Sequence, residues 1–544
     1  MSNFLRELRF PGAPLLFWLL LFLTFTTPFW DLGRPLLEVD DARYAEVPRE
    51  MIASGDWATP HLNELDYVEK PPLWYWLCAA SYKVFGVSEA AARLPLACLA
   101  VLGLLGTAWL GAWLFEARVG WTAAIMLGTS GLYFALGHFI TPDMGLTVWL
   151  LWCSAFLLRA LLRPQDAGWA APAAWACSGL AFLSKGLVGI LFPALWAASL
   201  ALLFPEVQTR WRGLLRPAGP ALFLLIAAPW FILMEHRHPG FLRFFFYEHH
   251  ILRFATQKFH RSNPWYFFLA LLPAGLLPWT PIVAAGIGRA LADWRRRDDG
   301  RGLALAAWAA LITLFFSFSS SKLVTYILPV FPQLALLGAA AGDPPRWARR
   351  CAAAGGAVLL LAALLTAPLV RLIPAGEMPA AAVPLATGAA ALLGAGLLWW
   401  SRNPRPLLAG AAGGLLIGAL GLIGMRVAVD TLSCRDLAAK ISSRRAPADQ
   451  IYTFRTYIHG LPFYTKSRTD RVLDWFGELE YADRDARLHE ARFGDQSQIA
   501  ALPLPDRRVF VVCRSGDAPV VLGLHPPGQA LATRAFGRWT LIEY

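Results

Sequence analysis

Residues 13–30 read APLLFWLLLFLTFTTPFW, without a single charged side chain. A helix needs ~20 mostly apolar residues to cross the hydrocarbon core of a bilayer, and this stretch is close to that length. No small-residue cleavage site follows it, so we interpret it as a retained membrane helix rather than a signal peptide. Comparable stretches recur along the chain, and their repetition decides the fold class.

The later apolar stretches occupy residues 93–116, 119–138, 144–163, 170–184, 187–204, 217–235, 265–288, 303–320, 323–342, 351–373, 382–400 and 406–428. Hydrophobic residues make up 57% of the 544-residue chain and charged residues only 16%, whereas about 25% of a soluble domain is charged. This composition excludes a soluble or disordered protein. The sequence predicts a mostly α-helical, polytopic integral membrane protein with about 13 transmembrane helices.

The stretch 73–87 is shorter, and Lys83 interrupts it, so we predict an amphipathic helix at the membrane surface. A fourteenth span is the alternative. Cytoplasmic loops are enriched in Lys and Arg, and this rule favours 13 spans with a cytoplasmic N-terminus. Each cytoplasmic loop then carries arginine: Arg118; Arg163; Arg210, Arg212 and Arg216; Arg295, Arg296, Arg297 and Arg301; Arg346, Arg349 and Arg350; Arg402 and Arg405. A fourteenth span would place these clusters outside.

This topology divides the chain into a membrane domain, residues 1–428, and a soluble domain on the outer side, residues 429–544. The membrane domain has two long outer loops, at 31–92 and 236–264. The soluble domain is predicted to be α/β, with a helix at 433–445 and strands at 450–454, 509–513 and 539–544. Cys434 and Cys513 in this domain could form a disulfide outside the cytoplasm, and we leave that alternative open.

The first outer loop begins with Glu38-Val39-Asp40-Asp41-Ala42-Arg43-Tyr44, which places three carboxylates within four residues. If the stretch is helical, Asp40 and Arg43 share a face at a spacing of three residues. A carboxylate beside the membrane can orient a reacting group, act as a base or bind a metal. The alternative is a solvated charged loop that caps a helix.

A second carboxylate, Asp143, follows Thr141 and Pro142 and precedes an apolar stretch. Taken alone, it is typical of a helix N-cap. The topology places it on the same side of the membrane as Asp40, however. Two carboxylates from separate elements on one side of the membrane favour a shared site.

Lysine is unevenly distributed, because the chain has seven lysines against 42 arginines. Lys440 and Lys466 belong to the soluble domain. The other five all fall on the outer side: Lys70, Lys83, Lys185, Lys258 and Lys322. Lysine binds phosphate as a compact point charge, so this distribution indicates an anionic ligand at the outer face. The alternative is that some of these side chains extend to the interface.

The 236–264 loop carries several histidines, including His250, and with Glu69 these could bind a divalent metal ion. No metal-ligand spacing supports that assignment, and no phosphate-binding glycine loop or Ser–His–Asp pattern occurs. The basic residues border a membrane, so we expect no nucleic-acid partner.

Several motifs together resemble a known family. They are the acidic start of a long outer loop after the first span, then EKPPLWYW at 69–76 and FGVSEAAARLP at 85–95, and TPD at 141–143. The chain resembles the GT-C glycosyltransferases of the protein-O-mannosyltransferase type, and within them the bacterial aminoarabinose transferases of lipid A. The resemblance covers roughly residues 13–345, whereas the last spans and the outer domain agree in layout only.

The resemblance implies transfer of 4-amino-4-deoxy-L-arabinose from undecaprenyl phosphate to a lipid A phosphate, by an inverting single displacement at the periplasmic face of the bacterial inner membrane. Asp40 and Asp143 match the family's catalytic acidic positions. Lys70 matches the lysine that binds the donor phosphate. The other substrate-binding candidates are Arg43, Tyr44, Tyr67, Lys185, Arg253, Lys322 and Tyr326. No cofactor is required, although a metal such as zinc at Glu69 and His250 is compatible with the resemblance.

Other functions remain open from the residues alone. A transferase of another polyprenyl-phosphate-linked sugar to protein or glycan would present the same motifs. A transporter or flippase would carry polar residues within its spans and an internal repeat, and neither is evident. A scaffold would leave the one-sided placement of acids and lysines unexplained.

Overall fold

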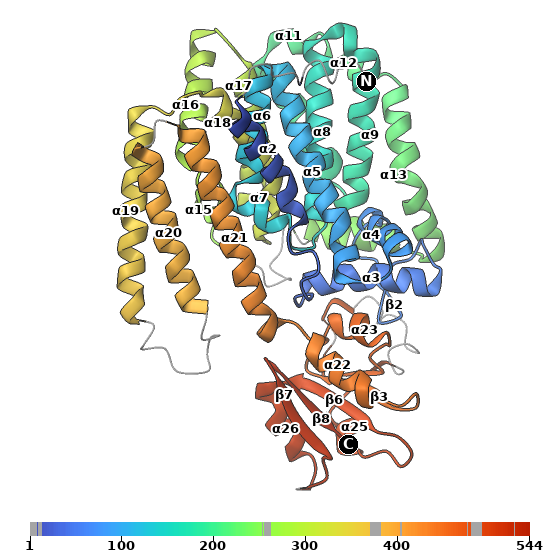
Figure 1. Ribbon diagram of the computed structural model, residues 1–544. Coiled ribbons are helices and arrows are strands. Elements are labelled where there is room, and N and C mark those ends of the chain that lie inside the picture. The colour runs from blue at the N-terminus through green and yellow to red at the C-terminus, as the bar shows by residue number, and fades with distance from the viewer. Residues whose placement is uncertain are drawn as a thin grey trace. The chain divides into compact units, whose positions relative to one another are not determined.

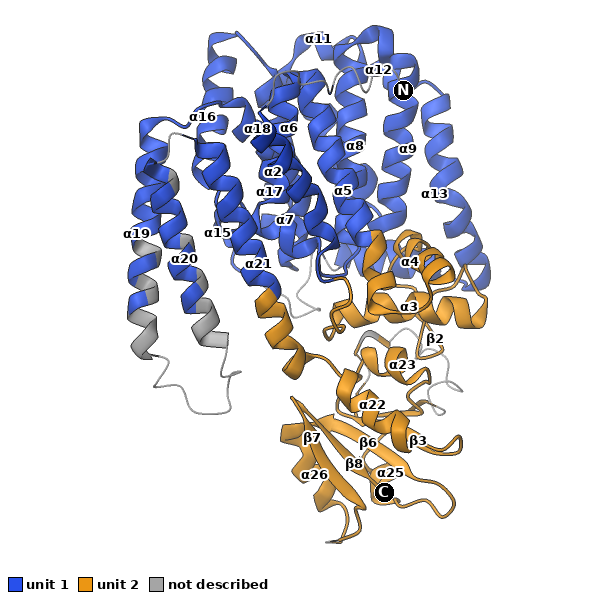
Figure 2. Ribbon diagram, viewed as in Figure 1, with its two compact units in different colours: residues 1–31, 96–422 blue, residues 32–95, 423–544 orange. Residues whose placement is uncertain are grey.

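The structure is a computed structural model that describes residues 8, 14–252, 254, 263–369, 382–402, 405–475, 477–479, 492–526 and 528–544. It divides into two compact units (Figure 2). Unit 1 consists of residues 1–31 and 96–422, and unit 2 of residues 32–95 and 423–544. The predicted boundary between residues 428 and 429 stays a prediction, but the first outer loop groups with the C-terminal residues.

Helices build the described part of unit 1 (Figure 1). The first half contains α2 (Leu15–Thr26), η1 (Thr27–Phe29), α5 (Glu89–Leu114, which starts in unit 2), α6 (Ala117–Gly128), α7 (Gly131–Leu136), α8 (Asp143–Leu162), η2 (Pro164–Asp166), α9 (Ala167–Lys185), α10 (Val188–Leu203), α11 (Pro205–Gln208) and α12 (Trp211–Leu214). The second half contains α13 (Ala218–Arg237), η3 (Arg243–Leu252), α15 (Phe267–Gly275), α16 (Thr280–Arg296), α17 (Arg301–Phe318), η4 (Val324–Val330), α18 (Phe331–Ala340), α19 (Arg346–Leu369), α20 (Ala382–Arg402) and α21 (Pro406–Leu432, which ends in unit 2).

Every apolar stretch predicted to span the membrane coincides with one of these helices or with a consecutive pair. Two stretches are interrupted. The stretch 119–138 breaks into α6 and α7, and 265–288 bends by 113° between α15 and α16. Among the described residues, five helices are long and apolar enough to cross a membrane, and this bent pair would be a sixth. A mostly helical membrane protein is therefore confirmed, while the figure of 13 spans stays a prediction.

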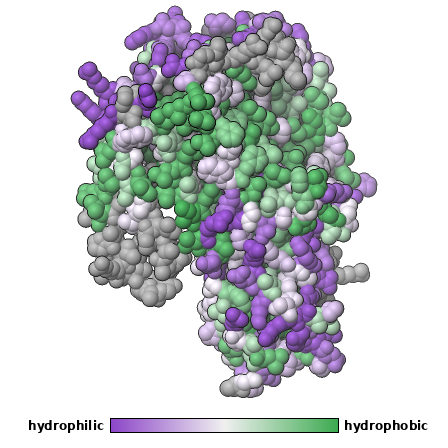
Figure 3. Space-filling view, in the orientation of Figure 1, coloured by the Kyte–Doolittle hydropathy of each residue, from purple (hydrophilic) through white to green (hydrophobic). Residues whose placement is uncertain are grey.

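The arginine-bearing loops of unit 1 gather at one end of its helices. Arg301 donates to the carbonyl of Leu114 at 2.5 Å, and Arg210 donates to the carbonyl of Leu161 at 2.8 Å. These bonds tie the ends of α5, α8 and α17 together with the α11–α12 segment. Hydrophobic residues cover much of the face shown in Figure 3. Many large apolar side chains of unit 1 are exposed, among them Leu15, Phe22, Leu202, Leu225, Ile232 and Phe318.

Close helix contacts in unit 1 depend on glycine. A Cβ on Gly120 of α6 would collide with the backbone of Ala108 in α5. A Cβ on Gly286 of α16 would collide in the same way with the backbone of Leu337 in α18. Small residues let membrane helices approach closely, where dispersion contacts hold them together.

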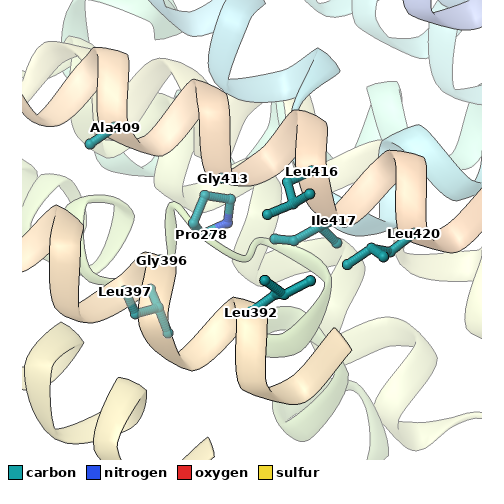
Figure 4. Close-up of a pocket in the computed structure, with 9 residues that line it drawn as sticks. All are labelled: Pro278, Leu392, Gly396, Leu397, Ala409, Gly413, Leu416, Ile417 and Leu420. Atoms are coloured by element: carbon teal, nitrogen blue, oxygen red, sulfur yellow. The ribbon is translucent and has the colours of Figure 1, made fainter. Parts of the chain in front are cut away.

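Two pockets among these helices are lined mainly by apolar side chains. One lies between α20, α21 and Pro278 (Figure 4), and its other lining residues are Leu392, Gly396, Leu397, Ala409, Gly413, Leu416, Ile417 and Leu420. The other, of about 720 Å³, lies among α8, α9, α10 and α12. Neither is lined by a predicted site residue, so neither positions the chemistry.

Unit 2 combines two parts of the chain. The first part contributes α3 (Asp40–Ser54), the hairpin of β1 (His61–Leu62) and β2 (Leu65–Asp66), and α4 (Leu73–Phe85). The second contributes α22 (Arg435–Arg444), β3 (Gln450–Phe454), α23 (Gly460–Thr465), β4 (Arg471–Leu473), η6 (Gly477–Leu479), β5 (Phe493–Gly494), α25 (Ser497–Ala500), β6 (Val509–Arg514), η8 (Ser515–Asp517), α26 (Ala518–Gly523), β7 (Ala532–Phe536) and β8 (Trp539–Glu543).

The strands of the second part form one sheet in the order β5-β4-β3-β6-β8-β7. Strands β5, β4, β3 and β6 run parallel, whereas β8 pairs antiparallel with β6 and β7. Strand β6 (VFVVCR) reads as a continuous apolar run, as expected of a strand buried on both faces. The stretch 73–87 is helical as predicted, while its place at the membrane surface stays a prediction. The helix at 433–445 and the three predicted strands are confirmed.

Cys434 and Cys513 are separate, buried thiols, so the disulfide alternative is wrong for this structure. Burial raises the pKa of the Cys513 thiol to about 12 and holds the pKa of Cys434 well above its ordinary value. A buried neutral thiol packs as a small apolar group and is a poor nucleophile.

Candidate functional site

In unit 2, Asp40 is the first residue of α3, and the side chain of Arg43 forms an ion pair with it one turn later. The prediction that Asp40 and Arg43 share one face of a helix is therefore confirmed. The Asp40 side chain is 40% exposed, whereas Arg43 is 6% exposed. The fold therefore buries the Arg43 guanidinium, while the Asp40 carboxylate that pairs with it is open to solvent. A carboxylate in this position is accessible to a ligand.

Aromatic rings surround Arg43. Its guanidinium carbon lies 5.1 Å from the ring centre of Tyr44 and 5.9 Å from that of Tyr67. Tyr44 stacks on Tyr75 with ring centres 6.3 Å apart. Burial raises the pKa of Tyr67 well above its ordinary value, so its hydroxyl stays neutral and donates to Glu69 Oε2 at 3.3 Å. Rings around a guanidinium hold it by cation–π attraction and limit its movement.

Lys70 lies in the turn that leads to α4. Its ammonium donates to the carbonyl oxygen of Glu69 at 3.3 Å, and both side chains are half-buried. Unit 2 thus brings together five predicted site residues besides Asp40: Arg43, Tyr44, Tyr67, Glu69 and Lys70.

Asp41 and Arg93 form an ion pair that the sequence did not reveal. Asp41 is fully buried, and its Oδ2 lies 2.5 Å from the guanidinium of Arg93. Arg93 also donates to the carbonyls of Leu32, at 2.9 Å, and Arg34. This pair anchors the chain before α3, so Asp41 is structural and its neighbour Asp40 is the residue that meets solvent.

The buried face of α3 carries further acidic residues. Glu50 accepts hydrogen bonds from the backbone amides of Asn63 at 2.8 Å and Glu64 at 2.9 Å, in the β1–β2 turn. Burial, followed by the neighbouring Glu46, raises the pKa of Glu50 to about 8. Glu46 itself makes two hydrogen bonds with Arg49, at 2.7 and 2.8 Å. Glu50 is therefore protonated at neutral pH.

In unit 1, Asp143 begins α8, and its carboxylate forms an ion pair with Lys185 at the end of α9. Both side chains are mostly buried, at 6% and 15% exposure. Asp143 makes no side-chain capping hydrogen bond, because Pro142 occupies the N-cap position. The N-cap alternative is therefore wrong, and a second helix supplies the partner.

Lys185 contacts two further elements. Its ammonium lies 4.3 Å from the ring centre of Tyr326 in η4. Its carbonyl oxygen lies 3.3 Å from His250 Nε2 in η3. Gly186 follows Lys185 with φ +82°, a backbone conformation that suits glycine, and a Cβ there would collide with the His250 ring. Four elements thus meet around Lys185.

The remaining predicted residues have other surroundings. The Lys322 ammonium is buried and donates to the carbonyl of Ser319 at 2.6 Å, in the turn after α17. Arg253 lies outside the described residues. Both ring nitrogens of His250 lie against backbone carbonyls, at 2.6 and 3.3 Å. Within the described part of the chain, no three His, Cys, Asp or Glu residues gather into a metal site, so the metal at Glu69 and His250 stays a prediction.

Each unit therefore holds a carboxylate, a lysine and at least one tyrosine in one neighbourhood. Unit 2 has Asp40 with Tyr44, Tyr67 and Lys70, and unit 1 has Asp143 with Lys185 and Tyr326. A carboxylate binds hydroxyl or ammonium groups, a lysine binds phosphate, and a tyrosine ring packs on a sugar face or a cation. These groups fit a phosphorylated sugar.

The comparisons with known proteins agree with this chemistry. Residues 69–233 match the family model described as dolichyl-phosphate-mannose-protein mannosyltransferase. The match includes Glu69, Lys70, Asp143 and Lys185. It agrees, over this part of the chain, with the family resemblance inferred from the motifs.

Curated relatives carry a more specific name, undecaprenyl phosphate-alpha-4-amino-4-deoxy-L-arabinose arabinosyl transferase. The one from Aeromonas salmonicida is 34% identical over 317 residues, 57% of this chain and 56% of that protein. The one from Pseudomonas aeruginosa (strain LESB58) is 34% identical over 305 residues, 55% of this chain and 54% of that protein. The aligned part of the chain thus spans about half the length of the curated relatives it matches.

The structural similarity covers more of the chain than the sequence similarity does. The crystal structure of ArnT from Cupriavidus metallidurans bound to undecaprenyl phosphate matches with a TM-score of 0.85 and 28% identity, covering 96% of this chain and 97% of that one. The same protein in the apo state matches with a TM-score of 0.83. The resemblance inferred from the sequence is confirmed in name and in fold.

Proposed function

We propose that the chain transfers 4-amino-4-deoxy-L-arabinose from undecaprenyl phosphate to a phosphate of lipid A, by an inverting single displacement. The observation that carries the proposal is the likeness along 96% of the chain to a protein solved with undecaprenyl phosphate bound. The names of the curated relatives supply the sugar. The lipid A acceptor rests on the family resemblance inferred from the sequence.

The donor carries opposite charges, since its sugar bears an amino group and its lipid bears a phosphate. The ion pair of Asp143 and Lys185 offers the complementary charges. In the proposed complex, Asp143 binds the ammonium and Lys185 binds the phosphate, each exchanging a protein partner for a ligand partner. Tyr326 keeps the lysine in place during the exchange, because its ring already contacts the ammonium. Lysines around the leaving phosphate stabilise the charge that develops on it.

The role of Asp40 depends on whether the acceptor group is already ionised. A phosphate monoester has a second pKa near ~6 and is largely ionised at neutral pH, so it needs little help from a base. We assign Asp40 to orienting and stabilising the reacting sugar rather than to removing a proton. Arg43 holds the carboxylate at the start of α3 for that task, and Lys70 contributes to donor phosphate binding.

We further propose 13 membrane spans in the bacterial inner membrane, with a cytoplasmic N-terminus and a periplasmic domain at 429–544. Two arginines of the predicted cytoplasmic loops support this orientation, because Arg210 lies against the end of α8 at Leu161 and Arg301 against the end of α5 at Leu114. Asp143 is the first residue of α8 and Lys185 is the last residue of α9, so this pair lies at the other end of α8 from Leu161. Reporters fused after Gly300 and after Asp430 should give cytoplasmic and periplasmic signals, and the reverse result would overturn the topology.

Mass spectrometry of lipid A tests the activity. Cells that express the chain should gain a lipid A species heavier by one aminoarabinose residue, and cells that express the Asp40→Asn variant at equal level should not. Purified protein given the aminoarabinose donor and lipid A should form the same product. The absence of a mass gain in both assays would contradict the proposal.

A second candidate is favoured by the family model at residues 69–233, whose description names a protein acceptor. A transferase of this kind would leave lipid A unchanged and add a sugar to protein or glycan. The same cells, analysed for glycosylated proteins and glycans, distinguish the two candidates.

A further inference from the structure

Glu38 is a buried carboxylate, 2% exposed, that lies against the C-terminal part of unit 2. Its Oε2 accepts a hydrogen bond from the backbone amide of His459 at 2.9 Å, and its Oε1 accepts one from the amide of Gly460 at 2.6 Å. The His459 ring nitrogen Nδ1 lies 3.4 Å from Oε2. A carboxylate removed from water needs such partners, and all three come from the start of α23.

The residues next to Glu38 are held by the same part of the chain. The Glu38 amide donates to the carbonyl of Leu432, the last residue of α21, at 2.9 Å. The Leu36 amide donates to the hydroxyl of Tyr464 in α23 at 2.8 Å. Helices α3, α4, α22 and α23 belong to one compact unit (Figure 2). The segment that precedes α3 is therefore fixed by residues about 400 positions later in the chain.

Asp40 lies two residues beyond Glu38, across a closed turn. The amide of Ala42 donates to the carbonyl of Leu37 at 3.1 Å, and the amide of Arg43 donates to that of Val39 at 3.0 Å. These bonds place Glu38 and Asp40 in one hydrogen-bonded turn. A displacement of the Glu38 carboxylate would therefore be expected to reach Asp40 through this turn.

Gly460 allows the close approach. A Cβ at this position would lie 2.7 Å from Glu38 Oε1 and 2.9 Å from Cys434 Sγ. The Glu38 side chain is 2% exposed and Cys434 is buried, so neither has space to retreat. Any larger residue at position 460 must push the carboxylate, which offers a way to disturb the contact from the opposite side.

We propose that Glu38 is a positioning residue, through which the start of α23 in the C-terminal region holds Asp40 at the angle that transfer requires. The kinetic part of this inference rests on the proposed function, whereas the structural part does not. It gives residues 429–544 a task within the reaction, which is to set the position of the Asp40 carboxylate.

The first test measures transfer by the purified full-length chain. Glu38→Gln removes the charge and leaves one carbonyl oxygen for two amides, and Gly460→Ala pushes the carboxylate. Each should lower kcat about tenfold to 100-fold per folded molecule, as misplacement of a reacting group does, with the donor KM within about twofold of wild type. Asp506→Asn, at an exposed position of the same domain, should leave both constants unchanged.

The two variants should also be non-additive, because they break one contact from its two sides. The double variant should lose no more than the more damaging single variant. Independent, multiplying losses, or unchanged kcat in both single variants with folded yield alone reduced, would overturn the positioning role.

The second test does not depend on activity. Hydrogen exchange in the intact protein should rise at residues 37–43 and at 459–461 in Glu38→Gln, while peptides of α8 and α9 exchange as in wild type. Unchanged exchange at 37–43 would overturn the inference even if the chain is an active transferase. A wild-type chain without transferase activity would instead refute the proposed function, and the exchange result would still decide whether α23 holds the turn.

Discussion

Asp40 pairs with Arg43 one turn along its own helix, whereas Asp143 pairs with Lys185 from a neighbouring helix. The first carboxylate is 40% exposed and the second 6%. Asp40 pairs with Arg43 within the same helix, and the contacts of its neighbours Glu38 and Asp41 hold it in position. Asp143 owes its position to the pairing itself, since its partner ties α8 to α9.

The difference implies different consequences of removing each charge. An exposed pair contributes about 0–1 kcal/mol to stability, because water screens the attraction. Breaking a buried pair costs about 3–5 kcal/mol, because the remaining partner keeps an uncompensated charge away from water. Asp40 itself is open to water while Arg43 is buried, so loss of Asp40 should affect chemistry more than folding, whereas loss of Asp143 should affect chemistry and folding together.

The largest expected effect is that of Asp40→Asn. Transfer should fall about 1,000-fold, the upper range for losing one group that stabilises a transition state. Thermal stability should fall less than in an Asp143 variant, because Asp40 is 40% exposed and the amide oxygen of asparagine can still accept a hydrogen bond from Arg43. Turnover and thermal unfolding of the same preparation measure both. Near-normal turnover would remove Asp40 from the site.

Asp143→Asn should lower transfer about 100-fold and also destabilise unit 1 by about 3 kcal/mol. The double variant Asp143→Asn/Lys185→Met removes the stranded charge, so stability should recover while transfer stays low. Equal stability of the single and double variants would show that the pair is not buried in the membrane-embedded protein.

Lys70→Ala should have a smaller effect, about tenfold in kcat/KM for the donor, as expected from one charge-assisted contact to phosphate. Lys83→Ala is the matched control, because Lys83 lies on α4 with its ammonium 4.5 Å from the ring centre of Trp57. Initial rates over a range of donor concentrations measure the change. Identical kinetics in the two variants would argue against a phosphate contact at Lys70.

Glu50→Gln should have the smallest effect on transfer near pH 7, because Glu50 has a pKa of about 8 and is already neutral there. The folded state binds one more proton than the unfolded chain between the ordinary carboxyl pKa and about pH 8, so wild-type stability should fall as pH rises through that window. The variant should lose this part of the slope. Unfolding temperatures from pH 5 to pH 9 measure it, and parallel curves would contradict the raised pKa.

The same contrast explains what the sequence could predict. Hydrophobic runs identified the helices, because burial in a bilayer constrains every residue of a span. The Asp40–Arg43 pair followed from helical spacing. The meeting of Asp143, Lys185 and Tyr326 was expected only as a shared side of the membrane, since spacing carries no information about which helices pack together.

The buried supports of Asp40 were not predicted. Arg93 lies in an apolar context near the start of α5, and its partner Asp41 looked like a mere neighbour of Asp40. The contact of Glu38 with His459 and Gly460 joins two segments far apart in sequence, and the acidic motif at 38–41 did not indicate this partner. The glycine that begins the short helix α23 was a signal whose meaning required the fold.

The contact between Glu38 and α23 also has a consequence for biosynthesis. Ribosomes add about 5–20 residues per second, so Gly460 follows Glu38 by roughly 20–80 s. During that interval the membrane helices between them are inserted, while the segment before α3 lacks its partners. The turn that carries Asp40 is completed late, so a nascent chain that stalls before α23 would enter the membrane without a finished site.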